Sequence, residues 1–341
     1  MPQRILLTQL RRIGDVLMTT AAVAAVRQAY PKAHITYLTE RPSLPVFQYS
    51  QNVDEVWTYP PGLMARIGLT WRLRRRRFDL VVDFFGNPRS ALMVWATGAP
   101  RRIGFNFPGR GRFYTDAVSL PSGALYSGSH KAALLAPLGI EVASPPLPLL
   151  PVSEVERQFA ARQLEALGVR PGELLVALSP VSRQPFRVWP VENYARLADG
   201  LIERYGAKVL PLWGPGEAHF IDALRLHMRH NALPDYPIPS LLQTAALLER
   251  SHLLIGNDNG PRHMAMAVGT PTVGVIGQSH PESWTPPGQP LHRYVARDPG
   301  CKHTCVYPRC ELACIKQVPY EAVLAETETL LEEILKHGHV H

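Results

Sequence analysis

The stretch that decides the fold is GNDNGPRHMAMAVGTPTVGVIG, residues 256–277. A short apolar run, HLLI at residues 252–255, precedes it, and a second apolar run closes it at residues 272–276. Between the two runs, a polar turn over residues 258–261 leads into a helical segment at residues 263–268. A strand, a turn, a helix and a second strand in this order predict one unit of a parallel α/β sheet.

The turn of this unit predicts an anion site, because a helix N-terminus offers free backbone N–H groups and the positive end of its dipole. Asp258, Asn259, Gly260 and His263 all lie at or near this turn. The same residues also fit an ordinary helix start in which Asp258 or Asn259 is the N-cap. The local pattern alone leaves both interpretations open.

Strand-like and helical segments alternate through both halves of the chain, which predicts an α/β fold. The proline-rich segment ASPPLPLLP, residues 143–151, interrupts the alternation and is typical of a linker. A length of 341 residues exceeds one typical core. We therefore expect two Rossmann-like domains, residues 1–150 and 151–341, with a ligand cleft between them. In the first half, we expect strands at residues 5–9, 34–38, 55–59 and 80–84, and helices at 16–30, 63–77 and 89–97.

Positive charge is concentrated in the first domain. Residues 1–165 carry 20 Lys and Arg against 11 Asp and Glu, whereas the remainder carries 16 against 17. The arginine run at residues 72–77 predicts contact with an anionic membrane or an acidic substrate, and the alternative is a solvated helix face. Met64, Ile67, Leu69 and Trp71 would form the apolar side of an interfacial helix. A nucleic-acid module is missing from the sequence. No signal peptide or spanning segment is visible, so we expect a cytoplasmic location.

The cysteines cluster in one short segment near the C-terminus, at Cys301, Cys305, Cys310 and Cys314. Such clustering argues against a disulfide framework. The spacing departs from the usual C-x2-C pairs of zinc sites. A structural zinc or iron–sulfur site and a reduced cluster without metal are both compatible with the sequence.

Three loops that follow expected strands carry residues that could act in catalysis or ligand binding. Asp15 follows the first strand and would act either as a general base or as a helix N-cap. Ser182, Arg183 and Arg187 would bind a phosphate, or they belong to an ordinary charged loop. Glu217 would accept hydrogen bonds from a nucleoside, or it stabilises the first turn of a helix. The chain has no G-x-G-x-x-G, P-loop or G-x-S-x-G motif.

Several blocks together resemble the ADP-heptose:lipopolysaccharide heptosyltransferases, glycosyltransferase family 9. The N-terminal block is ILLTQLRRIGDVLMTTAAVAAVRQAYP, the middle block is FDLVVDFFGNPRSALMVWATGAPRRIGF, and residues 256–277 resemble the family's donor-binding block. The cysteine segment is also similar to one in many members. Asn259 replaces the usual Ser or Thr of that pattern, and Arg187 stands where Lys is more usual.

The resemblance implies a GT-B fold and an inverting heptose transfer from ADP-L-glycero-D-manno-heptose to a lipopolysaccharide core sugar. It implies that Asp15 is the general base, that the chemistry needs no metal, and that the last helix crosses back to the first domain. The implied donor-binding residues are Ser182, Arg187, Glu217, Asp258, Asn259, Gly260 and His263. The acceptor-side candidates are Arg11, Arg12, Arg101 and Arg102.

Other functions fit the same fold. The alternatives are another nucleotide-sugar glycosyltransferase, a GT-B-like nucleotide-sugar epimerase, and a non-catalytic binder of sugar nucleotides. The basic first domain favours an anionic glycolipid acceptor at a membrane surface, because such surfaces attract Lys and Arg clusters.

Overall fold

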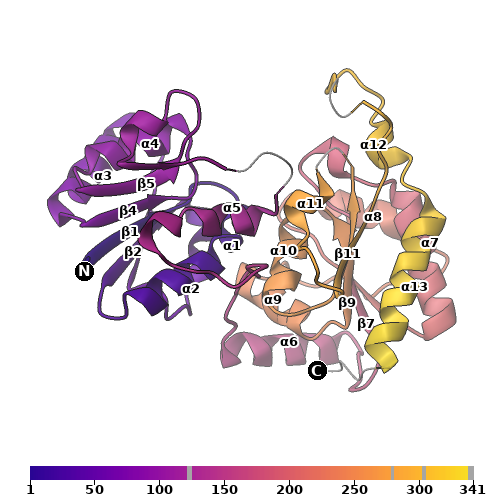
Figure 1. The fold of residues 1–341 in the computed structure, drawn as a ribbon. Coiled ribbons are helices and arrows are strands. Elements are labelled where there is room, and N and C mark those ends of the chain that lie inside the picture. Colours follow the sequence, from indigo (N-terminus) through magenta and orange to yellow (C-terminus); the bar gives the residue numbers. More distant parts are fainter. Residues whose placement is uncertain (121–124, 278–279, 302–304, 337–341) are drawn as a thin grey trace. The chain divides into compact units, whose positions relative to one another are not determined.

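The computed structural model describes residues 1–120, 125–277, 280–301 and 305–336 (Figure 1). The chain divides into two compact units, Met1–Pro151 and Val152–His341. Each unit contains one sheet in which all neighbouring strands run parallel. The α/β prediction is therefore confirmed, and the first unit ends at the last proline of the predicted linker.

The sheet of the first unit has six strands in the order β3-β2-β1-β4-β5-β6. Its central strands β1 and β4 contain uninterrupted apolar runs that are fully buried, as parallel strands with both faces covered require. The strands are β1 Arg4–Thr8, β2 His34–Thr39, β3 Glu55–Thr58, β4 Leu80–Asp83, β5 Arg101–Phe105 and β6 Asp116–Val118.

The helices of the first unit follow the predicted positions with one correction. A single helix was expected over residues 16–30, but the chain forms two short helices with a break at residues 18–19. The hydroxyl of Thr19 donates to the Val16 carbonyl, and the hydroxyl of Thr20 donates to the Leu17 carbonyl, both at 2.7 Å. These side chains compete with the regular helical ladder at the break. The helices are α1 Ile13–Leu17, α2 Thr20–Ala29, α3 Leu63–Arg76, α4 Pro88–Ala96 and α5 Ser127–Ala133, with 3-10 turns η1 Arg41–Phe47, η2 Gly111–Phe113 and η3 Ala136–Leu138.

The second unit has five strands in the order β11-β10-β9-β7-β8. Its strands are β7 Leu175–Ser179, β8 Lys208–Pro211, β9 Leu253–Asn257, β10 Thr272–Ile276 and β11 His292–Ala296. Its helices are α6 Glu154–Ala166, α7 Val191–Tyr205, α8 Ala218–His227, α9 Leu241–Glu249, α10 Gly260–Ala267, α11 Pro281–Trp284, α12 Ala313–Lys316 and α13 Tyr320–Lys336, with the 3-10 turn η4 Pro185–Arg187.

The last helix, α13, packs within the second unit against α7, β10 and β11 (Figure 1). Val323, Leu330, Leu331 and Ile334 of this helix are fully buried in the core of that unit. The apolar side chains of α13 thus complete the core around the second sheet. The crossing of this helix back to the first domain, which the resemblance implied, stays a prediction.

Three strands were not predicted from the sequence: β5, β6 and β11. Two of them, β6 and β11, lie at sheet edges, and β5 is the neighbour of β6. They begin with Arg101, Asp116 and His292, so their apolar runs are too short to stand out. Among the described residues, no helix combines the length and apolar character that crossing a membrane requires.

Candidate active site

Asp15 lies in the first turn of α1, just beyond the carboxyl end of β1, and its side chain is half-buried. The N-cap residue of this helix is Arg12, so the interpretation of Asp15 as an N-cap is wrong. Arg11 and Arg12, both exposed, have φ angles of 70° and 25°. Positive φ is costly for residues with a side chain and persists mainly where function demands it. The strained turn therefore presents two exposed arginines beside Asp15.

A buried carboxylate stands at the neighbouring strand end. Asp83, the last residue of β4, accepts hydrogen bonds from the backbone N–H groups of Phe85 and Gly86 at 3.0 and 3.1 Å. It also accepts from the hydroxyl of Tyr114 at 2.8 Å. Burial raises the pKa of Asp83, although these donors oppose the shift. Gly104 makes room for the tyrosine, because a Cβ there would lie 2.3 Å from its ring.

Lys131 of α5 reaches the same strand ends. Its ammonium donates to Gln9 Oε1 at 3.0 Å and to the Phe84 carbonyl at 2.5 Å. Burial lowers the pKa of Lys131 to about 8, while the charges of Asp15 and Asp83 oppose the shift. Lys131 is thus electrostatically coupled to both acids. No sequence signal marks this residue, since a single lysine in a helical segment is usually exposed.

Arg101 and Arg102 were predicted on the acceptor side, but the structure places them elsewhere. They begin β5, at the amino edge of the sheet, whereas Asp15 lies beyond its carboxyl edge. Arg101 pairs with Asp116 at 3.4 Å, and Arg102 donates to the Phe113 carbonyl at 3.0 Å. These contacts connect β5 to its neighbours, so the two arginines have a structural role instead.

In the second unit, a buried ion cluster forms where β9 leads into α10. Arg187 Nη1 lies 3.1 Å from Asp258 Oδ2, and His263 Nε2 lies 3.6 Å from Asp258 Oδ1. Burial alone would raise the pKa of Asp258, but His263, Arg187 and Arg262 outweigh it and hold the pKa at about 2. The structure thus brings together three of the predicted donor-site residues, which come from different loops of the chain.

Asn259 is the N-cap of α10, as one of the two interpretations predicted. Its Oδ1 accepts from the backbone N–H of Arg262 at 3.2 Å. Its Nδ2 donates to Ser179 Oγ at 2.8 Å and to the Val181 carbonyl at 2.9 Å. Both ends of the amide therefore have protein partners, and Gly260 begins the helix next to it. Asn259 supports the site rather than contacting a ligand through its amide.

Asn257, the last residue of β9, fixes the loop that carries Ser182 and Arg187. Its Oδ1 accepts from the backbone N–H of Trp189 at 3.1 Å and from the hydroxyl of Tyr194 at 2.9 Å. Ser182 Oγ closes a turn by accepting from the Gln184 N–H at 3.2 Å. The sequence analysis did not identify Asn257, because it ends a strand and no motif marks it.

Glu217 is the residue before α8, and its carboxylate accepts from the backbone N–H of Gly214 at 2.8 Å. The side chain closes the turn that follows β8. This contact fits the interpretation of Glu217 as a stabiliser of the first helical turn, and it holds the carboxylate at the carboxyl edge of the sheet.

Two polar atoms of the ion cluster have no hydrogen-bond partner within the described part of the chain. They are Arg187 Nε and His263 Nδ1, and both are buried. Buried polar atoms are paired in the great majority of native structures, so an orphaned one calls for a missing partner. A phosphate group would supply acceptor oxygens for both atoms if His263 carries its proton on Nδ1.

A further buried arginine, Arg262, adjoins the cluster. Its guanidinium is fully buried and donates to the Trp284 carbonyl at 3.2 Å and to Thr285 Oγ1 at 2.7 Å. It crosses β10 over Gly274, where a Cβ would lie 2.5 Å from Arg262 Nε. Burial, with the charge of Arg262, lowers the pKa of the nearby His292 to about 4. The sequence analysis missed Arg262, because a charged residue in a helix is normally on its exposed face.

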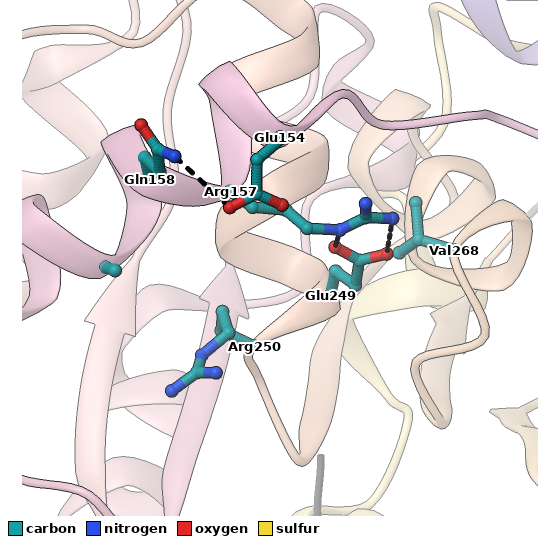
Figure 2. Close-up of a pocket in the computed structure, with 7 residues that line it drawn as sticks. Glu154, Arg157, Gln158, Glu249, Arg250 and Val268 are labelled. Carbon is teal, nitrogen blue, oxygen red and sulfur yellow. Dashed lines mark hydrogen bonds and ion pairs between the residues drawn. The ribbon is translucent and has the colours of Figure 1, made fainter.

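An open pocket of about 470 Å³ in the second unit lies apart from these residues (Figure 2). It is formed where α9 and α10 end, whereas the ion cluster lies where α10 begins. Arg157 and Glu249 face each other there, in a bidentate pair of 2.7 and 2.9 Å. Four residues of α6 and the ends of α9 and α10 line this pocket, so it is not part of the candidate site at the start of α10.

The four cysteines line one small cavity of about 80 Å³, together with Gly277 and Leu312. No disulfide joins them. Burial and the three neighbouring thiols raise the pKa of Cys314. Among the described residues, no group of three or more potential ligands is arranged to hold a metal ion. The four thiols thus gather around one cavity, and the zinc or iron–sulfur site stays a prediction.

Comparison with known proteins gives consistent matches. The family model described as glycosyltransferase family 9 (heptosyltransferase) matches residues 66–314. The chain is 26% identical to lipopolysaccharide heptosyltransferase 3 of Escherichia coli K12, over 95% of this chain and 97% of that protein. The crystal structure of a family 9 glycosyl transferase from Veillonella parvula DSM 2008 matches with a TM-score of 0.84 and 25% identity, covering 97% and 98% of the two chains. E. coli ADP-heptose lps heptosyltransferase II matches with a TM-score of 0.75 and 21% identity, covering 98% and 99%. This last likeness concerns the fold alone and confirms the predicted GT-B architecture.

Proposed function

This chain belongs to glycosyltransferase family 9, the heptosyltransferases, and from that membership we propose that it moves a heptose from ADP-L-glycero-D-manno-heptose to a lipopolysaccharide core sugar. The chain is accordingly a glycosyltransferase. The relative that supports this transfer is named a lipopolysaccharide heptosyltransferase. The chain spans 97% of its length.

The observation that carries the donor half is the buried cluster of Arg187, Asp258 and His263 at the start of α10. Asp258 contacts both Arg187 and His263, and Arg187 Nε and His263 Nδ1 have no hydrogen-bond partner among the described residues. The diphosphate of ADP would supply acceptor oxygens for them, and the positive end of the α10 dipole, at Gly260, adds to the attraction. We propose that Ser182 donates to the same diphosphate.

Glu217 would accept hydrogen bonds from the ribose through the carboxylate oxygen that Gly214 does not occupy. We propose that catalysis needs no metal ion, because Arg187 and the positive end of the α10 dipole, together with a hydrogen bond from His263, stabilise the leaving diphosphate.

In the first unit, Asp15 would act as the general base. It takes the proton from the acceptor hydroxyl as that oxygen attacks C1 of the heptose. The new C1–O bond forms while the bond from C1 to the diphosphate oxygen breaks, and its electron pair leaves with ADP. Attack opposite the leaving group inverts the configuration at C1. Lys131 favours the ionised form of Asp15 through its charge, which keeps the base ready for the next turnover.

The acceptor side of the proposal rests on the exposed arginines of the strained turn. Arg11 and Arg12 lie shortly before Asp15, and both are exposed. Arginine forms bidentate hydrogen bonds with phosphate, so the pair would hold a phosphorylated core sugar. We propose that the protein works as a peripheral protein on the cytoplasmic face of the membrane that carries this glycolipid.

Titration calorimetry with ADP, ADP-heptose and UDP tests the donor half. We expect ADP and ADP-heptose to bind and UDP to bind far more weakly. Arg187→Met should weaken ADP binding at least about tenfold, because it removes a charged, partly buried donor. Arg183→Met is the matched control, since Arg183 is an exposed arginine of the same loop. A preference for UDP would move the function to another sugar transfer.

Heptose transfer to a purified core acceptor tests the catalytic half. Asp15→Asn should leave ADP-heptose affinity unchanged and lower kcat by about 100-fold or more, as expected for the loss of a general base. Undiminished turnover of this variant would rule out Asp15 as the base.

A further inference from the structure

Six large apolar side chains are exposed together on two helices of the first unit. Their exposed fractions range from 52% to 81%, although the same helices bury other apolar residues in the core. We call this surface the α3–α4 face. It consists of Leu63, Met64, Ile67 and Trp71 on α3 and Leu92 and Trp95 on α4.

The two parts of the face belong to neighbouring helices (Figure 1). Arg74 Nη1 donates to the Ala96 carbonyl at 3.4 Å, which joins the last turns of α3 and α4. On α3, residues 63, 67 and 71 recur every four positions, and on α4, residues 92 and 95 are three apart, so each set shares one side of its helix. The buried Leu69 and Leu73 occupy the opposite side of α3. The face is thus a second apolar stripe that the core does not use.

The surroundings of this face are strongly basic. Residues 63–115 contain eleven arginines, and their only acidic residues are Asp79 and Asp83. Asp83 is fully buried. Asp79 accepts hydrogen bonds from the backbone N–H groups of Gln3 and Arg4 at the amino edge of the sheet. Outside this range, Glu55 pairs with Arg76 at 2.8 Å and Asp116 pairs with Arg101 at 3.4 Å. The other arginines have no such acidic partner among the described residues, so the surroundings of the face keep a net positive charge.

Two of these arginines lie against tryptophans of the same region. The Arg75 guanidinium lies 4.4 Å from the centre of the Trp71 ring, and that of Arg72 lies 4.5 Å from the Trp57 ring. Arginine over tryptophan combines an apolar body with a charged tip, which suits the boundary between lipid tails and headgroups.

We propose that the α3–α4 face docks on the surface of a bilayer that contains anionic lipid. The apolar residues would enter the boundary between headgroups and acyl chains, and the arginines would contact lipid phosphates. A second copy of the chain fits less well, because a symmetric contact would bring the two sets of arginines together without acidic partners.

The α3–α4 face begins at the same edge of the sheet as Asp15, so docking would bring a membrane-held acceptor toward the base. Helix α3 follows β3, so its first residues, Leu63 and Met64, lie toward the carboxyl edge of the sheet. Asp15 lies beyond the same edge, after β1. This part rests on the proposed function: a glycolipid held in the docked membrane would present its core sugar near the edge where the base stands.

Cosedimentation with vesicles tests the docking without any use of activity. The full chain is mixed with vesicles of phosphatidylethanolamine and phosphatidylglycerol, 3:1, or of phosphatidylcholine alone. We expect binding to the anionic vesicles and at least about tenfold weaker binding for Ile67→Ser/Trp71→Ser, because affinity scales with buried apolar area. The control is Val155→Ser/Leu226→Ser, which removes two exposed apolar residues of the second unit.

Three results would overturn the proposal: failure of the wild type to bind either vesicle, equal binding to both vesicle types, or undiminished binding of Ile67→Ser/Trp71→Ser. Self-association that this variant abolishes would assign the face to a second copy instead. Transfer to a water-soluble, deacylated core acceptor separates the two hypotheses. We expect the variant to match the wild type there, and a chain that transfers no heptose at all would contradict the proposed function while leaving the vesicle result intact.

Discussion

Lys131→Met tests the buried network at the carboxyl edge of the first sheet. The ammonium of Lys131 is fully buried, and its pKa falls from 10.5 to about 8. At neutral pH, the folded and unfolded states both hold the proton, and the folded state bears the whole cost of the buried charge. As the pH rises from about 8 towards 10.5, the folded state loses its proton first, so the unfolded state binds more protons and stability increases with pH.

The size of this effect follows from the two pKa values. Between pH 7 and pH 9.5, a lysine with pKa values of 10.5 unfolded and about 8 folded adds about 2 kcal/mol to the free energy of unfolding. Lys131→Met has no proton to lose, so its stability should lack this increment. Urea denaturation of both proteins at intervals of half a pH unit measures the difference.

The control is Lys32→Met, which removes an exposed lysine of the same unit and should leave the pH dependence parallel to that of the wild type. Asp15, Asp83 and the adjacent His130 also face Lys131, and both variants retain these three groups. Parallel stability curves for the wild type and Lys131→Met would refute the conclusion that Lys131 is buried with a lowered pKa.

In the transfer assay, we expect the activity of the wild type to change as the pH passes about 8. The same pH profile in Lys131→Met would refute the link between Lys131 and Asp15.

Three further predictions concern other positions. Arg11→Gly should raise the free energy of unfolding by about 1 kcal/mol, because glycine adopts the φ of 70° without strain, and it should raise the KM for the acceptor; a variant that is less stable than the wild type would contradict the strain. His292 is held neutral in the fold with a pKa of about 4, so its folded state binds fewer protons than the unfolded state as pH falls below 6.5. Between pH 7 and pH 5, the free energy of unfolding of His292→Gln should therefore fall by about 2 kcal/mol less than that of the wild type. An equal fall of both proteins in denaturant titrations would count against a buried, neutral His292. Gly274→Ala should destabilise the second unit by roughly 1–3 kcal/mol and weaken ADP binding, since the added methyl would displace the Arg262 guanidinium that supports Asp258; calorimetry showing wild-type affinity would contradict that support.

Most central elements of the fold followed from the sequence because they bury continuous apolar runs. Strands β1, β4, β7, β9 and β10 each stand out in this way, and their order around short turns predicts a parallel sheet. Strands β5, β6 and β11 did not stand out, because they begin with the polar residues Arg101, Asp116 and His292 and have short apolar runs. The break between α1 and α2 was also missed, because it depends on two threonine hydroxyls whose partners only the fold defines.

The candidate site was predictable where residues sit in loops after strands. Asp15, Asp258 and His263 lie at such places, and the last two meet as expected. Arg101 and Arg102 were misplaced, because an arginine pair in sequence does not show which end of a strand it occupies. The sequence does not identify Lys131 and Arg262 as site residues. Each is a charged helical residue whose burial depends on acids from elsewhere in the chain.

The hydrogen bonds of Asn259 also limit which substitutions position 259 can accept during evolution. Its amide holds the start of α10 and at the same time reaches Ser179 and the Val181 carbonyl on the neighbouring loop. A serine or threonine at this position would still cap the helix, but its single short hydroxyl cannot also reach Ser179 and the Val181 carbonyl. Homologous chains with asparagine here should therefore inherit a small hydrogen-bonding residue at position 179 with it. The exchange Asn259→Ser alone would remove the contacts of α10 with Ser179 and Val181, while Asn257 would still hold the loop that carries Arg187. A change at position 259 therefore favours a matching change at position 179.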